Sequence, residues 1–342
     1  MQYARLGDTG LKVSSLCMGA MTFGSGFYGI GEVDRDGARE LVQRCLDAGV
    51  NFFDTADVYS RGESEELLGR AFDDLGVARD DIVIATKVRG AMSDAAAEGT
   101  GDVNNAGLSR KHVIAGCEAS LRRLGTDHID LYQIHGVDRS TPLDETMRAL
   151  DDLVRAGKVR YVGCSNLAVR HILRANDIAT LGGWSPFVSL QAYYSLVCRD
   201  LEHELLPLCR EEGIGVTVWS PLAGGFLTGK FRRADEKGPA GSRRSGFDFP
   251  PLDKEQGYDV VELLEELAEA KGATIPQLAL AWLLQRDGVS SVIIGAKRVE
   301  QLEDDLGAVD VSFTSDELER IDDLTAPDAL YPQWMIERQN AS

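Results

Sequence analysis

The stretch that decides the fold is Asn51-Phe-Phe-Asp-Thr-Ala-Asp-Val-Tyr59. A short apolar run ends on the carboxylate of Asp54, and the phenol of Tyr59 follows five residues later. Two further apolar runs downstream end on Lys87 and on His135. If these runs are neighbouring parallel strands about 4.8 Å apart, their carboxyl ends lie at one edge of the sheet. We therefore expect the four side chains to meet at one site.

The same alternation of apolar runs and helical patterns continues along the chain. We predict strands at residues 15–21, 51–54, 82–87, 129–135, 159–164, 187–193, 215–220 and 291–294. We predict helices at residues 34–48, 63–75, 109–124, 142–156, 167–176, 202–212, 256–271, 275–286, 298–307 and 315–324. Strands that are apolar on both faces are typical of parallel strands covered by helices.

Eight regular strand–helix units without a linker favour a closed (β/α)8 TIM barrel over a doubly wound sheet. We therefore predict a single α/β domain over residues 1–342, with a β-hairpin over residues 2–13 and extra helices near the C-terminus. Active sites of such barrels lie at the carboxyl ends of the strands. The long loops expected after the first, third and seventh strands fall on that same rim.

Composition narrows the classes of partner. The 342 residues are 44% hydrophobic and carry a net charge of −19, which supports a sizeable core and argues against nucleic acid or an anionic membrane as a partner. No apolar run approaches the roughly 20 residues that span a bilayer, and the N-terminus lacks a signal-peptide pattern. The six cysteines and five histidines show no metal-ligand spacing. We expect a cytoplasmic, metal-free protein, and the sequence leaves monomer and homo-oligomer undecided.

The four polar side chains suit proton transfer to a carbonyl oxygen. A free tyrosine has a pKa near 10 and donates poorly at neutral pH, and a neighbouring cation such as Lys87 lowers that pKa. Asp54 would keep the lysine charged and oriented, while His135 could hydrogen-bond the substrate oxygen. The alternative for each residue alone is an ordinary ion pair at the barrel rim.

In this order and at these strand ends, Asp54, Tyr59, Lys87 and His135 resemble the catalytic tetrad of the aldo-keto reductases. The surrounding sequence is similar too, and the resemblance spans residues 2–325. The matching segments are Asn51-Phe-Phe-Asp-Thr-Ala, Asp130-Leu-Tyr-Gln-Ile-His, Gly157-Lys-Val-Arg-Tyr-Val-Gly-Cys-Ser-Asn166 and Trp219-Ser-Pro-Leu-Ala-Gly-Gly. The chain is similar to the branch with bacterial reductases, aryl-alcohol dehydrogenase-like reductases and potassium-channel β-subunits.

This resemblance implies an oxidoreductase that uses NADP(H) to reduce an aldehyde or ketone reversibly, with Tyr59 as the proton donor. It implies that Ser165, Asn166 and Gln191 hold the nicotinamide carboxamide and that Trp219 stacks on the nicotinamide ring. The alternatives are helix capping by Ser165 or Asn166 and a core role for Trp219. The other residues that the resemblance places at the cofactor are Gly19, Met21, Asp54, Ser220, Leu222, Gly224, Lys230, Arg243, Gly295, Lys297, Gln301 and Asp305.

The cations among these residues decide the expected cofactor. Arg243, Lys297 and Arg298 near one phosphate would favour NADPH over NADH. Related sequences usually carry Asn where Asp305 stands, and a carboxylate can accept but not donate a hydrogen bond to adenine. Asp304 also makes this end of the site less cationic.

Two glycine-rich patterns point elsewhere but lack the required context. Residues 24–29 match the dinucleotide fingerprint GxGxxG, yet the helix expected to follow starts only at Asp34. Residues 224–230 match GxxxxGK, but Phe231 replaces the Ser or Thr that would hold Mg²⁺. Glycines and Lys230 could still hold an anion in this loop, and the alternative is a flexible surface loop.

The substrate pocket is less well determined. Phe23, Tyr28 and the tail over residues 325–342, with Trp334, could form apolar walls of a pocket, or the tail could serve only for docking. Arg89 is a candidate for acidic substrates. Two other functions remain open: a cofactor-sensing module like the channel β-subunits, and a Schiff-base aldolase that uses Lys87.

Overall fold

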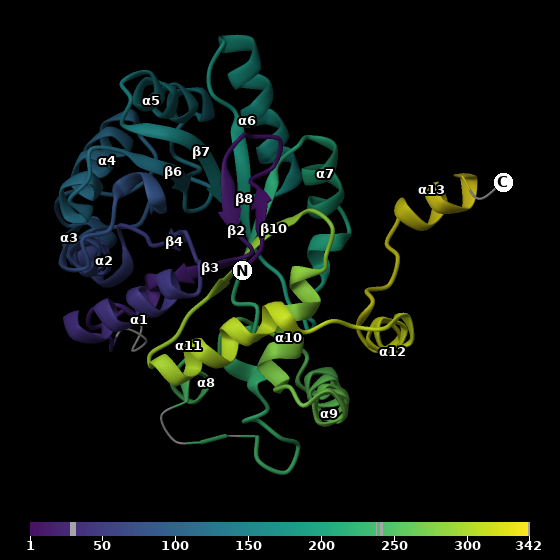
Figure 1. Cartoon of the computed structure of the whole chain (residues 1–342). Helices are drawn as coiled ribbons and strands as arrows, with labels where there is room; N and C mark the ends of the chain where they lie inside the picture. Colours follow the sequence, from purple (N-terminus) through teal and green to yellow (C-terminus); the bar gives the residue numbers. More distant parts are fainter. Residues whose placement is uncertain (28–31, 237, 240–241, 341–342) are drawn as a thin grey trace.

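The computed structural model describes residues 1–342 except residues 28–31, 237, 240–241 and 341–342. Eight strands form a closed barrel in the order β10-β3-β4-β5-β6-β7-β8-β9, and every neighbouring pair is parallel. The predicted (β/α)8 barrel is therefore confirmed (Figure 1). Its strands are β3 (Leu16–Gly19), β4 (Phe52–Asp54), β5 (Val83–Val88), β6 (Ile129–Ile134), β7 (Val159–Ser165), β8 (Phe187–Tyr193), β9 (Gly215–Trp219) and β10 (Val289–Ile294).

Helices surround the barrel, and their apolar faces pack against the strands. Asp34 caps the first of them as expected, because its side chain accepts a hydrogen bond from the amide of Gly37 (3.0 Å). Among the described residues, no helix combines the length and apolar character needed to cross a membrane. The longer helices are α1 (Arg35–Asp47), α2 (Glu63–Asp74), α4 (Arg110–Leu124), α5 (Leu143–Arg155), α6 (Val169–Gly182), α9 (Lys254–Lys271), α10 (Ile275–Leu284), α11 (Val299–Leu306) and α12 (Ser315–Thr325).

Some shorter helices differ from the prediction. The expected loop over residues 88–108 contains a helix whose start is capped by Ser93 and whose end is Gly99, in the left-handed region at φ 68°. The helix expected at residues 202–212 begins only at residue 205. Such elements have too few turns for a hydrophobic period to show in the sequence. They are α3 (Asp94–Glu98), α7 (Leu205–Glu211), α8 (Arg243–Gly246) and α13 (Gln333–Asn340).

The predicted hairpin, β1 (Tyr3–Arg5) and β2 (Lys12–Ser14), closes the amino-terminal end of the barrel. Its turn meets the start of β9, where the amide of Asp8 donates to the carbonyl oxygen of Gly213 (2.8 Å). A hairpin side chain, Leu6, is fully buried in a cluster with the inward-facing barrel residues Phe52 and Leu131. This end is therefore filled by apolar side chains, and the carboxyl ends of the strands remain for chemistry.

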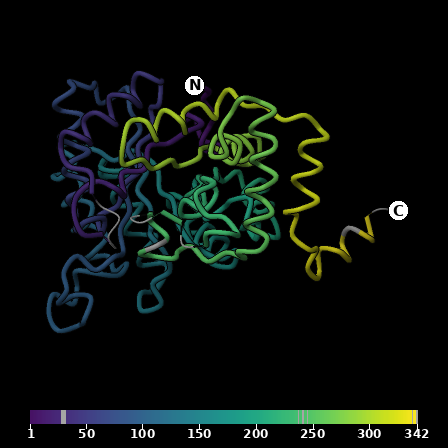
Figure 2. Tube along the Cα trace, turned by 90° about the horizontal axis from the view of Figure 1, so that it is seen from below, coloured from purple at the N-terminus to yellow at the C-terminus, as the bar shows by residue number. Residues whose placement is uncertain are grey.

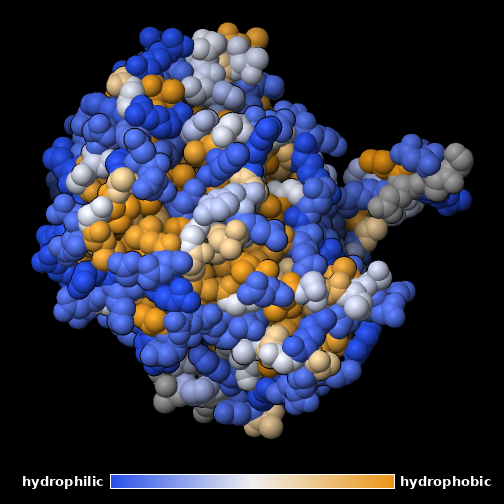
Figure 3. Space-filling model, viewed as in Figure 1, coloured by the Kyte–Doolittle hydropathy of each residue, from blue (hydrophilic) through white to orange (hydrophobic). Residues whose placement is uncertain are grey.

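The C-terminal segment runs along the outside of the barrel. Arg199 ties α12 to the body, because its guanidinium donates to Asp322 (2.7 Å) and to Thr325 (2.8 Å). Beyond α12 the chain leaves the body, and α13 stands clear of the barrel (Figures 1 and 2). This part of the chain projects from an otherwise rounded surface (Figure 3), and Tyr331, which precedes α13, is 75% exposed.

The burial of Leu6 at the amino-terminal end of the barrel makes a testable contribution to stability. We expect Leu6→Ala to lower the free energy of unfolding by about 2–5 kcal/mol, because the substitution leaves a cavity among fully buried neighbours. Urea denaturation followed by circular dichroism measures this. Leu181, which is 89% exposed on α6, is the matched control, and Leu181→Ala should change stability by at most about 0.5 kcal/mol. Equal effects of the two substitutions on the free energy of unfolding would contradict a stabilising role for the buried Leu6 side chain.

Candidate active site

Three adjacent strands bring the predicted side chains to one rim. Asp54 is the last residue of β4, and Lys87 lies near the end of β5. His135 directly follows β6, and its amide donates to the carbonyl oxygen of Val88 (3.0 Å). The parallel register pairs Lys87 with Gln133, two residues before the histidine. The strand ends therefore coincide as the sequence pattern predicts.

The ammonium of Lys87 is the centre of this group. The side chain is fully buried, and its Nζ donates to Asp54 Oδ1 (2.5 Å) and to the carbonyl oxygen of Thr55 (2.7 Å). The same Nζ lies 3.5 Å from the hydroxyl of Tyr59. The tyrosine ring meets the imidazole of His135 edge-on, with the ring centroids 5.7 Å apart. The structure thus brings all four predicted residues together.

Two glutamines complete the surroundings of Asp54. Its Oδ2 accepts hydrogen bonds from Gln191 Nε2 (2.8 Å) and from Gln133 Nε2 (3.3 Å). The sequence reasoning did not single out Gln133. A signal was present, because a polar residue two positions before His135 in a strand faces the same side, which here is the barrel interior. Gln191, expected at the cofactor, contacts Asp54 in this structure.

The pKa shifts define the protonation states of the site. Burial raises the pKa of Tyr59 above its ordinary value, although the charge of Lys87 acts to lower it. Lys87 thus acts on the pKa of this phenol in the expected direction, but desolvation outweighs the cation and the net shift is upward. Burial would lower the pKa of Lys87, but Asp54 and Tyr59 raise it overall. Near neutral pH the phenol is protonated and the lysine is charged.

The imidazole carries no charge near neutral pH. Burial lowers the pKa of His135 to about 3, and the positive charges of Lys87 and Arg89 act in the same direction. A neutral imidazole offers one N–H donor and one acceptor nitrogen. His135 can therefore hydrogen-bond a carbonyl oxygen without adding a charge to the site.

The ends of β7 and β9 carry groups with unused hydrogen-bonding capacity. The Oγ of Ser165 is buried and has no hydrogen-bond partner among the described residues. Helix capping, the alternative role for Ser165 and Asn166, is not realised, because the N-cap residue of α6 is Ala168 and no side chain caps the helix. Instead Asn166 Oδ1 accepts from Trp219 Nε1 (3.2 Å), and the indole stacks on Tyr193 with the ring centroids 5.0 Å apart.

The loop after β9 turns sharply around Ser220 and Gly224. Ser220 Oγ accepts from the amide of Gly224 (2.9 Å). Gly224 has φ 67°, and a Cβ at this position would lie 2.4 Å from the carbonyl oxygen of Phe249, so only glycine fits. Leu222 is half-buried before it, and Lys230 is exposed and makes no ion pair within the described ranges.

The remaining cofactor candidates lie in the segments that follow β3, β9 and β10. Arg243 opens α8, its Nε is buried without a partner among the described atoms, and burial lowers its pKa. Lys297 pairs with Glu32 (2.8 Å), and its amide donates to Gln301 (3.1 Å). Burial and the charge of Asp304 raise the pKa of Asp305 to about 7, against the effect of Lys230. Gly19 ends β3, Met21 lies in the 3-10 turn after it, Gly295 directly follows β10, and Arg298 is exposed at the start of α11.

The substrate-pocket candidates occupy different places. Phe23 is fully buried, and its carbonyl oxygen accepts from Ser60 Oγ (3.2 Å), so its side chain belongs to the core. Arg89 is exposed at the end of β5. Trp334, on α13, is 43% exposed and lies on the segment that stands clear of the barrel. Tyr28 lies outside the described residues.

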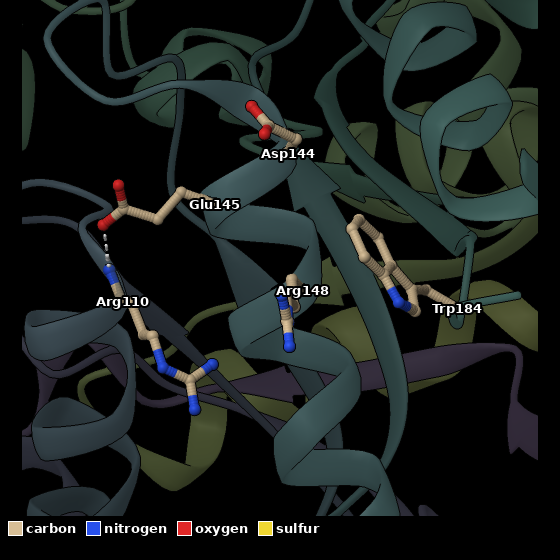
Figure 4. A pocket seen from close by; sticks show the side chains of 5 residues that line it. All are labelled: Arg110, Asp144, Glu145, Arg148 and Trp184. Carbon is tan, nitrogen blue, oxygen red and sulfur yellow. Dashed lines mark hydrogen bonds between the residues drawn. The ribbon is translucent and has the colours of Figure 1, made fainter. Parts of the chain in front are cut away.

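A groove on the outer helical layer is a separate feature (Figure 4). Arg110 of α4 and Glu145 of α5 face each other across it, and the amide of Arg110 donates to the Glu145 carboxylate (2.8 Å). The guanidinium of Arg110 pairs with Asp152. The residues that line the groove come from α4, α5 and the segment after α6, not from the strand ends, so the groove is no candidate for the tetrad chemistry. They are Arg110, Asp144, Glu145, Arg148 and Trp184.

Comparison with known proteins gives matches over almost the whole chain. The model of the aldo/keto reductase family matches residues 15–326. The versiconal hemiacetal acetate reductase of Aspergillus parasiticus is 34% identical over 97% of this chain and 99% of its own length. A probable voltage-gated potassium channel subunit beta of Arabidopsis thaliana is 40% identical over 91% of this chain and 92% of its own length. An uncharacterized oxidoreductase of Bacillus subtilis is 39% identical over 95% of this chain and 96% of its own length.

The neutral imidazole gives a spectroscopic prediction. We expect His135 to remain uncharged at pH 5, because its pKa is about 3, whereas a free histidine near 6.5 is mostly charged there. Nitrogen chemical shifts of isotopically labelled protein, assigned with the His135→Gln variant, measure this. The folded pKa is depressed, so His135 adds stability above pH 6.5 that is lost as the pH falls towards 3. A charged His135 at pH 5 would refute this protonation state.

Proposed function

The chain belongs to the aldo/keto reductase family, and we propose that it uses NADP(H) to reduce an aldehyde or ketone to the alcohol in a reversible reaction. The observation that carries this proposal is the buried contact of one ammonium, that of Lys87, with both Asp54 and the hydroxyl of Tyr59. Relatives named as reductase and oxidoreductase support the reaction class.

Tyr59 is the proposed proton donor, through its hydroxyl. Burial keeps the phenol protonated before reaction, and the adjacent ammonium of Lys87 stabilises the phenolate that forms as the proton leaves. Asp54 and the carbonyl oxygen of Thr55 hold this ammonium in place. The opposing effects of burial and charge on one hydroxyl suit a group that must hold a proton and then release it.

His135 is the proposed group that orients the substrate. Its ring lies edge-on to the ring of Tyr59, and its neutral state leaves one N–H for a carbonyl oxygen. A substrate oxygen bound between the imidazole and the phenol would receive two hydrogen bonds. Such convergence orients the carbonyl and stabilises the negative charge that develops on its oxygen.

The residues present fit a dinucleotide with an additional phosphate. The unpartnered Oγ of Ser165, with Asn166 and Trp219 beside it, would hold the nicotinamide end. Lys230, which makes no ion pair among the described residues, and Arg243, whose Nε has no partner among them, would hold phosphate oxygens. When bound, the nicotinamide supplies or accepts the hydride, and the protein contributes binding, orientation and electrostatics.

The remaining functions can be weighed against the same geometry. A Schiff-base aldolase needs a neutral lysine, whereas Asp54 helps to raise the pKa of Lys87 and keeps it charged. A cofactor-sensing module with little turnover is the second candidate, because relatives are named as probable potassium channel β-subunits. The assembled tetrad favours turnover, and measurable reduction of aldehydes by the protein alone separates the two functions.

The role of Tyr59 can be tested by Tyr59→Phe. We expect kcat for reduction of 4-nitrobenzaldehyde to fall about 10²- to 10⁴-fold, the range for loss of a general acid, with NADPH affinity nearly unchanged. Absorbance at 340 nm measures turnover, and fluorescence titration measures cofactor binding. Tyr161, which packs in the hairpin cluster at the opposite end of the barrel, provides the control Tyr161→Phe. Unchanged turnover of Tyr59→Phe would remove the phenol from the mechanism.

The cofactor preference gives an independent test. We expect kcat/KM to be at least about 10-fold higher for NADPH than for NADH, because a charge-assisted contact with the extra phosphate contributes about 1.5–3 kcal/mol. Steady-state kinetics with each cofactor at a fixed aldehyde concentration measures the ratio. Arg243→Ala should reduce this ratio mainly by weakening the binding of NADPH. A preference of the native protein for NADH would refute the phosphate assignment.

A further inference from the structure

Arg89 lies at the rim, two residues after Lys87, and is hydrogen-bonded through both its main chain and its side chain. Its backbone has φ 147°, and its carbonyl oxygen accepts from the amide of Gly107 (3.0 Å). Its Nε donates to the carbonyl oxygen of Val137 (2.9 Å), in the loop after β6. Contacts with two different loops thus fix both the main chain and the guanidinium. An arginine placed this way loses little conformational entropy when it binds a ligand.

The guanidinium lies beside the catalytic imidazole. An added Cβ on Gly136, the residue directly after His135, would lie 3.6 Å from Nε and 3.8 Å from Cζ of Arg89. Gly136 has φ 145°, which side chains rarely adopt, so the arginine packs on bare backbone. The charge of Arg89 is also one cause of the lowered pKa of His135. The positive charge is therefore close to the proposed position of the reacting carbonyl.

No acidic side chain neutralises this arginine within the part of the chain that the structure describes. Asp138, in the neighbouring loop, is already satisfied by the amide of Leu108 (2.7 Å) and by the hydroxyls of Ser140 and Thr141 (2.6 and 2.7 Å). In contrast, Lys87 is compensated by Asp54. In a chain with a net charge of −19, Arg89 is an uncompensated cation beside the acid–base residues.

We propose that Arg89 binds a carboxylate on the substrate, so that the preferred substrates are aldehydes or ketones that carry a carboxylate group. With Nε fixed on Val137, the terminal guanidinium nitrogens remain for a ligand. They present parallel N–H donors that match the two oxygens of a carboxylate. This inference rests on the proposed function, because it assigns the substrate class of the same site.

The kinetic test compares 4-carboxybenzaldehyde with its neutral analogue methyl 4-formylbenzoate. We expect the native protein to favour the acid in kcat/KM, and Arg89→Gln to reduce that preference about 10- to 100-fold, as for loss of a charge-assisted hydrogen bond. Arg139→Gln is the matched control, since it removes one exposed positive charge from the loop after β6. An unchanged preference of Arg89→Gln for the acid over the ester would overturn the proposal. A higher kcat/KM of the native protein for 4-formylphenyl phosphate than for 4-carboxybenzaldehyde would also overturn it.

A binding measurement separates this inference from the proposed reaction. Calorimetry with 4-(hydroxymethyl)benzoate, the alcohol that reduction would produce, should show about 10- to 100-fold weaker binding to Arg89→Gln than to the native protein or Arg139→Gln. Equal affinity for all three would refute the role of Arg89. If the native protein reduced neither aldehyde but bound this carboxylate through Arg89, the proposed function would fail and the anion site would stand.

Discussion

The buried ion pair of Lys87 and Asp54 is the constraint on which the site depends. An ammonium removed from water costs several kcal/mol unless it is paired and hydrogen-bonded. Here Lys87 meets Asp54 and the carbonyl oxygen of Thr55, and Gln133 and Gln191 donate to the other oxygen of Asp54. Side chains from four barrel strands thus form or support one buried ion pair. The same contacts that make the lysine tolerable inside the barrel also fix its distance from Tyr59.

The division of the barrel into two ends follows from how each end is filled. The hairpin fills the amino-terminal end with Leu6 and its apolar neighbours. The polar residues collect at the carboxyl end, where strand ends and loops leave donors without partners, such as the Oγ of Ser165. Charge is unevenly distributed on that rim, since within the described part of the chain Lys87 has an acidic partner and Arg89 has none. The proposed proton donor therefore lies between a neutral imidazole and a paired ammonium, with the cation of Arg89 nearby.

Much of this could be predicted from residues alone, and the exceptions have physical reasons. Periodicity predicted the eight barrel strands because buried parallel strands must be apolar on both faces. It did not show α3 or α13, since one or two turns carry no clear period. It did not show that Gln133 and Gln191 share Asp54, because partners that lie 79 and 137 residues from Asp54 in sequence carry no local pattern. Nor did the sequence show that the ring of Phe23, named as one possible wall of a pocket, is completely buried.

By itself, the sequence determined which chemical groups the protein has and the order in which strand ends present them. Asp54, Lys87 and His135 each end an apolar run, and in a closed parallel barrel such ends must lie on one rim. Only the tertiary structure decided the protonation states, because pKa values depend on burial and on charges brought in from other strands. It therefore decided that Tyr59 keeps its proton, that His135 is neutral, and that Arg89 lies beside it with no acidic partner among the residues described.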